Sequence, residues 1–223
     1  MTLAAPRGTI ADLIDERDPM PVIDSEITFH GLVFDVRRDQ VDLGDAGQVT
    51  REYLDHPGAV VVLAWHEFDG VPHLLLVHQY RHATGTRLWE LPAGLLDVPG
   101  EPPWRAAARE LAEEGDLVAT TWHVLSDDVA SPGILPEWRR VFLARDLGDL
   151  PEDERHTREG EEHDLRPLWV PFDDAVEAVI TGRLHNASTV AGILAADAHR
   201  RRHWVHLRPF DAPWPEHPAY LET

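Results

Sequence analysis

The chain has 223 residues and a mass of 25.1 kDa, with 43% hydrophobic and 27% charged side chains, a composition that excludes a disordered tail or a miniprotein. Forty acidic side chains oppose twenty basic ones, all of them arginine, and the net charge is −20. This charge disfavours nucleic-acid binding, and the absence of lysine excludes Schiff-base enzymes, P-loop nucleotide sites and lysine general bases.

The chain also contains no cysteine, which excludes disulfides, thiolate nucleophiles and Cys-ligated zinc. No stretch approaches the roughly 20 apolar residues of a membrane span, and residues 1–24 have no apolar run long enough for a signal peptide. We therefore expect a cytoplasmic protein that binds neither nucleic acid nor a membrane.

The first part of the chain is predicted to be rich in β-strands. Residues 26–42 alternate apolar and polar side chains around a glycine, which indicates one or two half-buried strands, and residues 49–54 form another after a turn at 44–47. His56, Pro57 and Gly58 then mark a boundary, because proline and glycine interrupt regular structure. We expect a small β-rich unit at 1–57 and a larger domain at 58–223.

The larger unit alternates strand and helix patterns. Residues 59–65 are almost continuously apolar, as in a strand buried on both faces, and 73–81 resemble its partner. Further strands are predicted at 141–144 and 168–170, with helices at 101–114, 173–181 and 187–202. Between them, residues 147–166 carry eight acidic side chains, and a long acidic loop inside a domain is usually functional or disordered.

The strongest chemical signal lies in the helix at 101–114. At about 100° per residue, Glu110, Glu113 and Glu114 share an arc of about 100°, where three like charges repel unless a cation lies among them. A hard divalent metal such as Mg²⁺ fits an all-oxygen ligand set, and Arg109 is placed to brace the cluster. We expect Trp104, Ala108 and Leu111 to form the opposite, core-facing side. The alternative is an ordinary solvated helix face.

Gly94, Glu101 and the run Arg109-Glu-Leu-Ala-Glu-Glu114 resemble the signature of the Nudix hydrolases. The resemblance implies an α/β/α sandwich with a mixed sheet, and Mg²⁺, or alternatively Mn²⁺, held by the Ala93 carbonyl and three glutamates. The sequence departs from the signature twice: six residues instead of five separate Gly94 from Glu101, and Asp116 replaces a final glycine. That glycine often has positive φ, and aspartate is a tolerant replacement, so we expect modest strain with metal binding retained.

Three further motifs resemble the ADP-ribose pyrophosphatase branch, including its actinobacterial members: Gln79-Tyr-Arg81, Glu90-Leu-Pro-Ala-Gly94 and Ser131-Pro-Gly133. In that branch the N-terminal strands exchange between subunits of a homodimer. The resemblance implies that Arg81 and Arg51 bind the diphosphate and that Glu90 contacts the nucleoside, although either arginine could instead be a surface ion-pair partner. Phe29 and Phe34 could stack on adenine or fill a core.

The implied reaction is hydrolysis of the diphosphate of ADP-ribose to AMP and ribose 5-phosphate. Glu110 and Glu114 would act with the metal, and a general base would come from the acidic loop, with Glu162 as first choice and Glu161 as second. Arg155 and Arg158 of that loop could instead neutralise the substrate. Two alternatives stay open: hydrolysis of another nucleoside diphosphate sugar, and a sensor that binds ADP-ribose without cleaving it.

Overall fold

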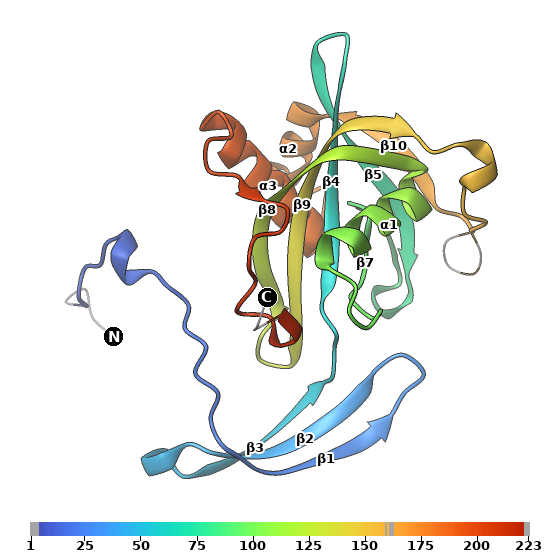
Figure 1. The fold of residues 1–223 in the computed structure, drawn as a ribbon. Helices are drawn as coiled ribbons and strands as arrows, with labels where there is room; N and C mark the ends of the chain where they lie inside the picture. The colour runs from blue at the N-terminus through green and yellow to red at the C-terminus, as the bar shows by residue number, and fades with distance from the viewer. Residues whose placement is uncertain (1–4, 159, 161–162, 221–223) are drawn as a thin grey trace.

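The computed structural model describes residues 5–158, 160 and 163–220, which form two separate β-sheets (Figure 1). The smaller sheet contains the N-terminal strands, and the larger one is covered by helices on both faces. No helix in these described ranges is both long and apolar enough to cross a membrane.

The N-terminal sheet is an antiparallel meander of three strands: β1 (Val22–His30), β2 (Asp35–Asp42) and β3 (Gln48–Leu54). The alternating segment predicted at 26–42 therefore contains two strands and the turn between them. All nine residues of β1 are exposed. A few contacts join this sheet to the rest of the chain, among them the hydrogen bond from the Leu54 amide to the Ile134 carbonyl, 3.1 Å long.

The larger sheet has the order β10-β5-β4-β9-β8-β11, with β6 paired to β5 and β7 paired to β4. The pair β4–β9 is parallel and the other pairs are antiparallel, which makes the sheet mixed as predicted. Its strands are β4 (Ala59–Phe68), β5 (Val71–Arg81), β6 (Thr86–Glu90), β7 (Ala93–Leu95), β8 (Leu117–Ser131), β9 (Leu135–Asp149), β10 (Arg166–Pro171) and β11 (Arg208–Pro209).

Three helices cover this sheet: α1 (Pro103–Gly115) on one face, and α2 (Phe172–Ile180) and α3 (Ala187–Arg201) on the other. The buried run of β4 supplies both cores, because alternate residues of a strand point to opposite faces. Val60 and Val62 pack with Leu111 of α1, whereas Val61 and Leu63 belong to the core that contains α2 and α3. The predicted α/β/α sandwich is thus confirmed.

The sequence prediction was wrong about the two longest strands. Residues 117–131 were not predicted to be a strand, and β9 extends well beyond the predicted 141–144, so the acidic loop begins at 150 instead of 147. Polar residues hid both strands: Arg139 and Arg140 of β9 are buried because they pair with Asp128 and Asp127 of β8. A hydrophobic pattern cannot identify a strand whose buried positions are filled by ion pairs.

Candidate active site around the acidic helix

Helix α1 begins and ends with residues that suit those positions. Pro103 occupies the first helical turn, where its missing N–H costs nothing. At the other end Asp116 has φ 54° and ψ 33°, the left-handed conformation expected of the residue that replaces the signature glycine, and its amide bonds to the Ala112 carbonyl at 3.2 Å. The core-facing side consists of Ala106, Ala107 and Leu111, whereas Trp104 and the predicted Ala108 are only half-buried.

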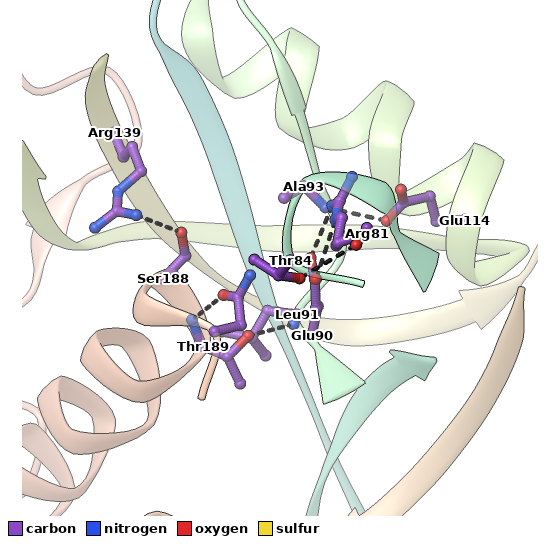
Figure 2. A network of polar contacts seen from close by, with 10 residues as sticks. Arg81, Thr84, Glu90, Leu91, Ala93, Glu114, Arg139, Ser188 and Thr189 are labelled. Atoms are coloured by element: carbon purple, nitrogen blue, oxygen red, sulfur yellow. Dashed lines mark hydrogen bonds and ion pairs between the residues drawn. The ribbon is translucent and has the colours of Figure 1, made fainter. Parts of the chain in front are cut away.

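The acidic face of α1 points at strand β7. Glu110 and Glu114 are 8% and 5% exposed, and Glu113 is half-buried. The Glu110 carboxyl group lies against Gly94, where a Cβ atom would overlap it, so only glycine permits this approach. Glu114 accepts a hydrogen bond of 3.1 Å from the Ala93 amide (Figure 2). The alternative of a solvated helix face is therefore wrong for Glu110 and Glu114.

Arg109 holds the acidic residues together, as its spacing predicts. Its guanidinium donates to Glu101 at 3.2 Å, Glu110 at 2.5 Å and Glu113 at 3.5 Å. Burial alone would lower the pKa of Arg109, but the hydrogen bond to Glu101 and the charges of Glu110 and Glu101 outweigh burial and raise that pKa. The arginine thus remains charged and partly neutralises three carboxylates.

The residues around Gly94 suit a hard divalent cation. They supply carboxylate oxygens from one helix face and lie beside a glycine whose missing side chain leaves room for the Glu110 carboxyl group. Across the described ranges, no three His, Cys, Asp or Glu side chains converge into a complete ligand set. Arg109 explains this for Glu110 and Glu113, because its guanidinium already holds both carboxylates.

A polar pocket of about 390 Å³ opens beside the same glycine. Arg81 and Glu90 lie on one side of it, where the arginine Nε and Nη2 donate to the two carboxylate oxygens at 3.0 and 2.7 Å. Glu90 is 3% exposed, so this bidentate pair fixes the direction of the Arg81 side chain (Figure 2). Ala93 and Gly94 also line the pocket, which brings together three predicted positions and the signature glycine.

The other predicted substrate-binding residues lie on or beside the N-terminal sheet. Arg51 is exposed on β3, and its Nη1 donates to the Thr50 carbonyl at 2.9 Å. Phe29 is 61% exposed on β1, and Phe34 stacks on His56 with ring centroids 5.2 Å apart. None of these three residues lines the 390 Å³ pocket as the described residues form it. To bind a substrate in this pocket, Arg51, Phe29 and Phe34 would have to come from a second chain, or the N-terminal sheet would have to lie differently against the pocket.

The predicted general bases, Glu162 and Glu161, lie outside the described residues. An arginine that precedes them in the loop is informative: Arg158 donates to the Glu113 and Glu114 carbonyls at 3.1 and 3.0 Å and to the Asp116 carboxylate at 2.8 Å. The acidic loop is thereby attached to the C-terminal end of α1. Arg155 donates to the Leu150 carbonyl at 3.1 Å. The alternative role of both arginines in neutralising the substrate stays a prediction.

Sequence reasoning missed one wall of the pocket. Arg139 of β9 and Ser188 at the start of α3 line it, and the arginine Nη1 donates to the serine Oγ at 2.8 Å. These residues are far apart in the sequence and belong to no motif. The one sequence signal is that two adjacent arginines on β9 face two adjacent aspartates on β8, a pattern that becomes visible only once the strand register is known.

Comparisons with known proteins agree with this geometry. The profile of the NUDIX domain matches residues 55–192. The chain is 44% identical over 197 residues to the ADP-ribose pyrophosphatase of Mycobacterium tuberculosis, covering 88% of this chain and 92% of that protein. It is 34% identical over 171 residues to the ADP-ribose pyrophosphatase of Bacillus subtilis, covering 77% and 89%.

A solved structure shares the fold. It is described as an ADP compounds hydrolase, and it superposes with a TM-score of 0.68 over 85% of this chain and 98% of its own at 19% sequence identity.

Proposed function

The chain belongs to the Nudix family, and on this premise we propose that it hydrolyses the diphosphate of ADP-ribose to AMP and ribose 5-phosphate. The observation that carries the proposal is the buried Glu110 carboxyl group against Gly94, beside Glu114 and a polar pocket. The relatives from M. tuberculosis and B. subtilis are both named ADP-ribose pyrophosphatases and match over most of their length.

The proposed metal site consists of Glu110, Glu113, Glu114 and the Ala93 carbonyl, with Mg²⁺ as the ion and Mn²⁺ as the alternative. When bound, such an ion makes a coordinated water more acidic and offsets the negative charge that collects on the phosphate oxygens. Arg109 keeps the carboxylates in place from the side. Release of Glu110 from Arg109 would let its oxygens turn toward the cation.

The proposed diphosphate ligand is Arg81, whose planar guanidinium suits two phosphate oxygens. Its bond to Glu90 supports this role, because a charge that is already oriented loses little conformational entropy on binding. The proposed general base is Glu162, with Glu161 as second choice. The Arg158–Asp116 ion pair supports that placement, since it attaches the loop one residue before its acidic run to the metal-binding helix.

The proposed assembly is a homodimer in which residues 1–57 act as a separate unit and contact the partner. The exposed β1 strand supports this proposal: it presents Val22, Ile23, Ile27 and Phe29 to solvent, and exposed apolar side chains on an uncovered strand favour pairing with another chain. Arg51, Phe29 and Phe34 would then reach the nucleoside end of the partner subunit's active site.

The decisive experiment incubates the purified protein with ADP-ribose and Mg²⁺ and separates the products by chromatography. AMP and ribose 5-phosphate in equal amounts are expected, with loss of activity on chelation. ADP-ribose that binds without being cleaved would instead identify a sensor, and faster cleavage of another nucleoside diphosphate sugar would change the substrate.

A further inference from the structure

The wall of the pocket opposite the acidic helix has a chemistry of its own. Strand register places Arg139 beside Ala59, and Ala59 beside Leu95, so β9 lies two strand spacings, or about 10 Å, from β7. The pocket therefore reaches from Gly94 and the Glu110 carboxyl group to Arg139 and the start of α3. Figure 2 shows the Arg139–Ser188 contact on one side and the Arg81–Glu90 and Ala93–Glu114 contacts on the other.

Arg139 is buried and fixed by a carboxylate. Arg139 is 7% exposed, and its Nε and Nη2 donate to one oxygen of Asp128 at 2.6 and 2.5 Å. Its third nitrogen, Nη1, donates to Ser188 Oγ at 2.8 Å. A guanidinium carries only donors, so the serine oxygen is the acceptor and its hydroxyl hydrogen is directed elsewhere. A hydroxyl that accepts from a cation is also a stronger donor.

Ser188 is held firmly by the first turn of α3. Asn186 caps this helix by accepting from the Thr189 amide at 2.9 Å, and Thr189, fully buried, accepts from the Leu91 amide at 2.9 Å. The turn is thus tied to the segment between Glu90 and Ala93. The position of the Ser188 hydroxyl relative to the metal-binding loop is therefore set before any ligand arrives, which lowers the entropy cost of binding.

The wall offers the Ser188 hydroxyl as a donor and the Glu137 carboxylate as an acceptor, and the pocket lining that the described residues of this chain form contains no aromatic ring. A nucleobase normally stacks on aromatic side chains, whereas a sugar presents hydroxyl oxygens and needs none. A volume of about 390 Å³ that starts at the diphosphate position suits a compact, hydroxyl-bearing group. A sugar hydroxyl both accepts and donates, so it matches the Ser188 hydroxyl and the Glu137 carboxylate on this wall.

From this geometry we propose that Ser188, positioned by Arg139 and Asp128, is a specificity-determining residue that donates a hydrogen bond to a hydroxyl oxygen of the distal sugar, the group on the diphosphate opposite adenosine. This inference rests on the proposed function and extends it. Ser188 is the residue that contacts the substrate, whereas Arg139 acts through Ser188 and is a positioning residue.

The test compares Ser188→Ala with Thr181→Ala, which removes a hydroxyl at the end of α2 outside this pocket. We expect Ser188→Ala to lower kcat/KM for ADP-ribose about tenfold and to weaken inhibition by ribose 5-phosphate, with AMP inhibition unchanged. Ser188→Thr, which keeps the hydroxyl, should restore most of the loss. Weakened AMP inhibition instead would place the nucleoside at this wall, and an unchanged kcat/KM would remove Ser188 from the site; either result overturns the proposal.

Arg139→Lys tests the positioning role. It should reduce kcat/KM for ADP-ribose in wild-type protein but have little further effect in the Ser188→Ala background. Full additivity of the two losses would overturn the role of Arg139. If wild-type protein does not cleave ADP-ribose, the proposed function fails, and calorimetric binding of ribose 5-phosphate to wild type and Ser188→Ala still decides the sugar contact.

Discussion

Asp116 shows how this chain replaces the signature glycine at the end of helix α1. Its φ of 54° costs a non-glycine residue about 1 kcal/mol, but its carboxylate gains an ion pair of 2.8 Å with Arg158. That pair is partly exposed, so its contribution is of similar size or smaller. The two effects nearly cancel, which explains why an acidic residue is tolerated there.

Substitutions at Asp116 should separate these two effects. Asp116→Gly relieves the backbone and loses the ion pair, so its free energy of unfolding should lie close to that of wild type. Asp116→Ala loses the pair and keeps the strain, and it should be about 1 kcal/mol less stable than Asp116→Gly in urea unfolding. Equal stability of the alanine and glycine variants would mean that the backbone relaxes instead of being strained.

The proposed metal role of α1 can be tested at Glu114. Glu114→Gln keeps a carbonyl oxygen for the Ala93 amide but removes the charge, so the fold should persist while kcat falls on the order of a hundredfold or more. The matched control is Glu177→Gln on α2, outside the 390 Å³ pocket. An ADP-ribose assay at saturating Mg²⁺ measures the rate; near wild-type turnover would place the metal ligands elsewhere.

At the scale of elements, periodic patterns and signature residues could be predicted from the sequence. The apolar run of β4 and the spacing of Glu101, Arg109 and Glu110 define local structure by themselves, and the structure reproduces them. The β8–β9 pair could not be predicted, because its buried positions include Arg139 and Arg140, and their burial depends on aspartates that only strand register brings alongside. Ser188 could not be predicted as part of the pocket either, because only the fold brings the start of α3 beside Arg139 of β9.

The β8–β9 pair and the C-terminal segment meet at Arg140. This side chain is 2% exposed and donates to both oxygens of Asp127, to the Ala212 and Pro213 carbonyls, and packs over Trp214 at 4.4 Å. Removing it leaves a mostly buried carboxylate and two carbonyls without these donors. Arg140→Ala should therefore lower the free energy of unfolding by about 3–5 kcal/mol.

A double-mutant cycle identifies the source of that loss. The Arg140→Ala, Asp127→Ala double variant should be destabilised by clearly less than the sum of the single variants, because it removes both buried charges together. Urea unfolding followed by tryptophan fluorescence measures all three. Strict additivity would show that Arg140 acts through packing on Trp214 and not through Asp127.

On the scale of the whole molecule, His217 ties the C-terminal segment to the linker between the two sheets. Its Nε2 donates to the Pro57 carbonyl at 3.0 Å and its Nδ1 accepts from the Ala219 amide at 3.2 Å, an arrangement that requires the neutral ring. Burial lowers the pKa of His217, and the bond to Pro57 only partly offsets this. Below about pH 6.5 the unfolded chain therefore binds a proton that the folded chain resists.

The free energy of unfolding should accordingly fall as the pH drops from about 6.5 toward the lower pKa of folded His217. His217→Gln, which can still donate to Pro57 but does not titrate, should flatten part of this dependence. Some slope should remain, because burial also lowers the pKa values of His56, His123 and His199. The control His185→Gln alters an exposed histidine and should keep the wild-type slope; an identical slope in His217→Gln would exclude this linkage.

The exposed apolar residues of β1 are the reason that we expect a homodimer. A monomer would leave Ile23, Ile27 and Phe29 in water along one uncovered strand, and burying them against a second chain recovers roughly 25 cal/mol for each Å² of apolar surface. Light scattering coupled to size exclusion should give about 50 kDa, twice the 25.1 kDa of one chain.

Ile27→Asp should shift the mass toward one chain and reduce ADP-ribose hydrolysis, because Arg51 and Phe29 would no longer reach a partner. A wild-type species with the mass of one chain and full activity would contradict the dimer, and Val118→Asp, exposed on β8, is the matched control for a surface charge.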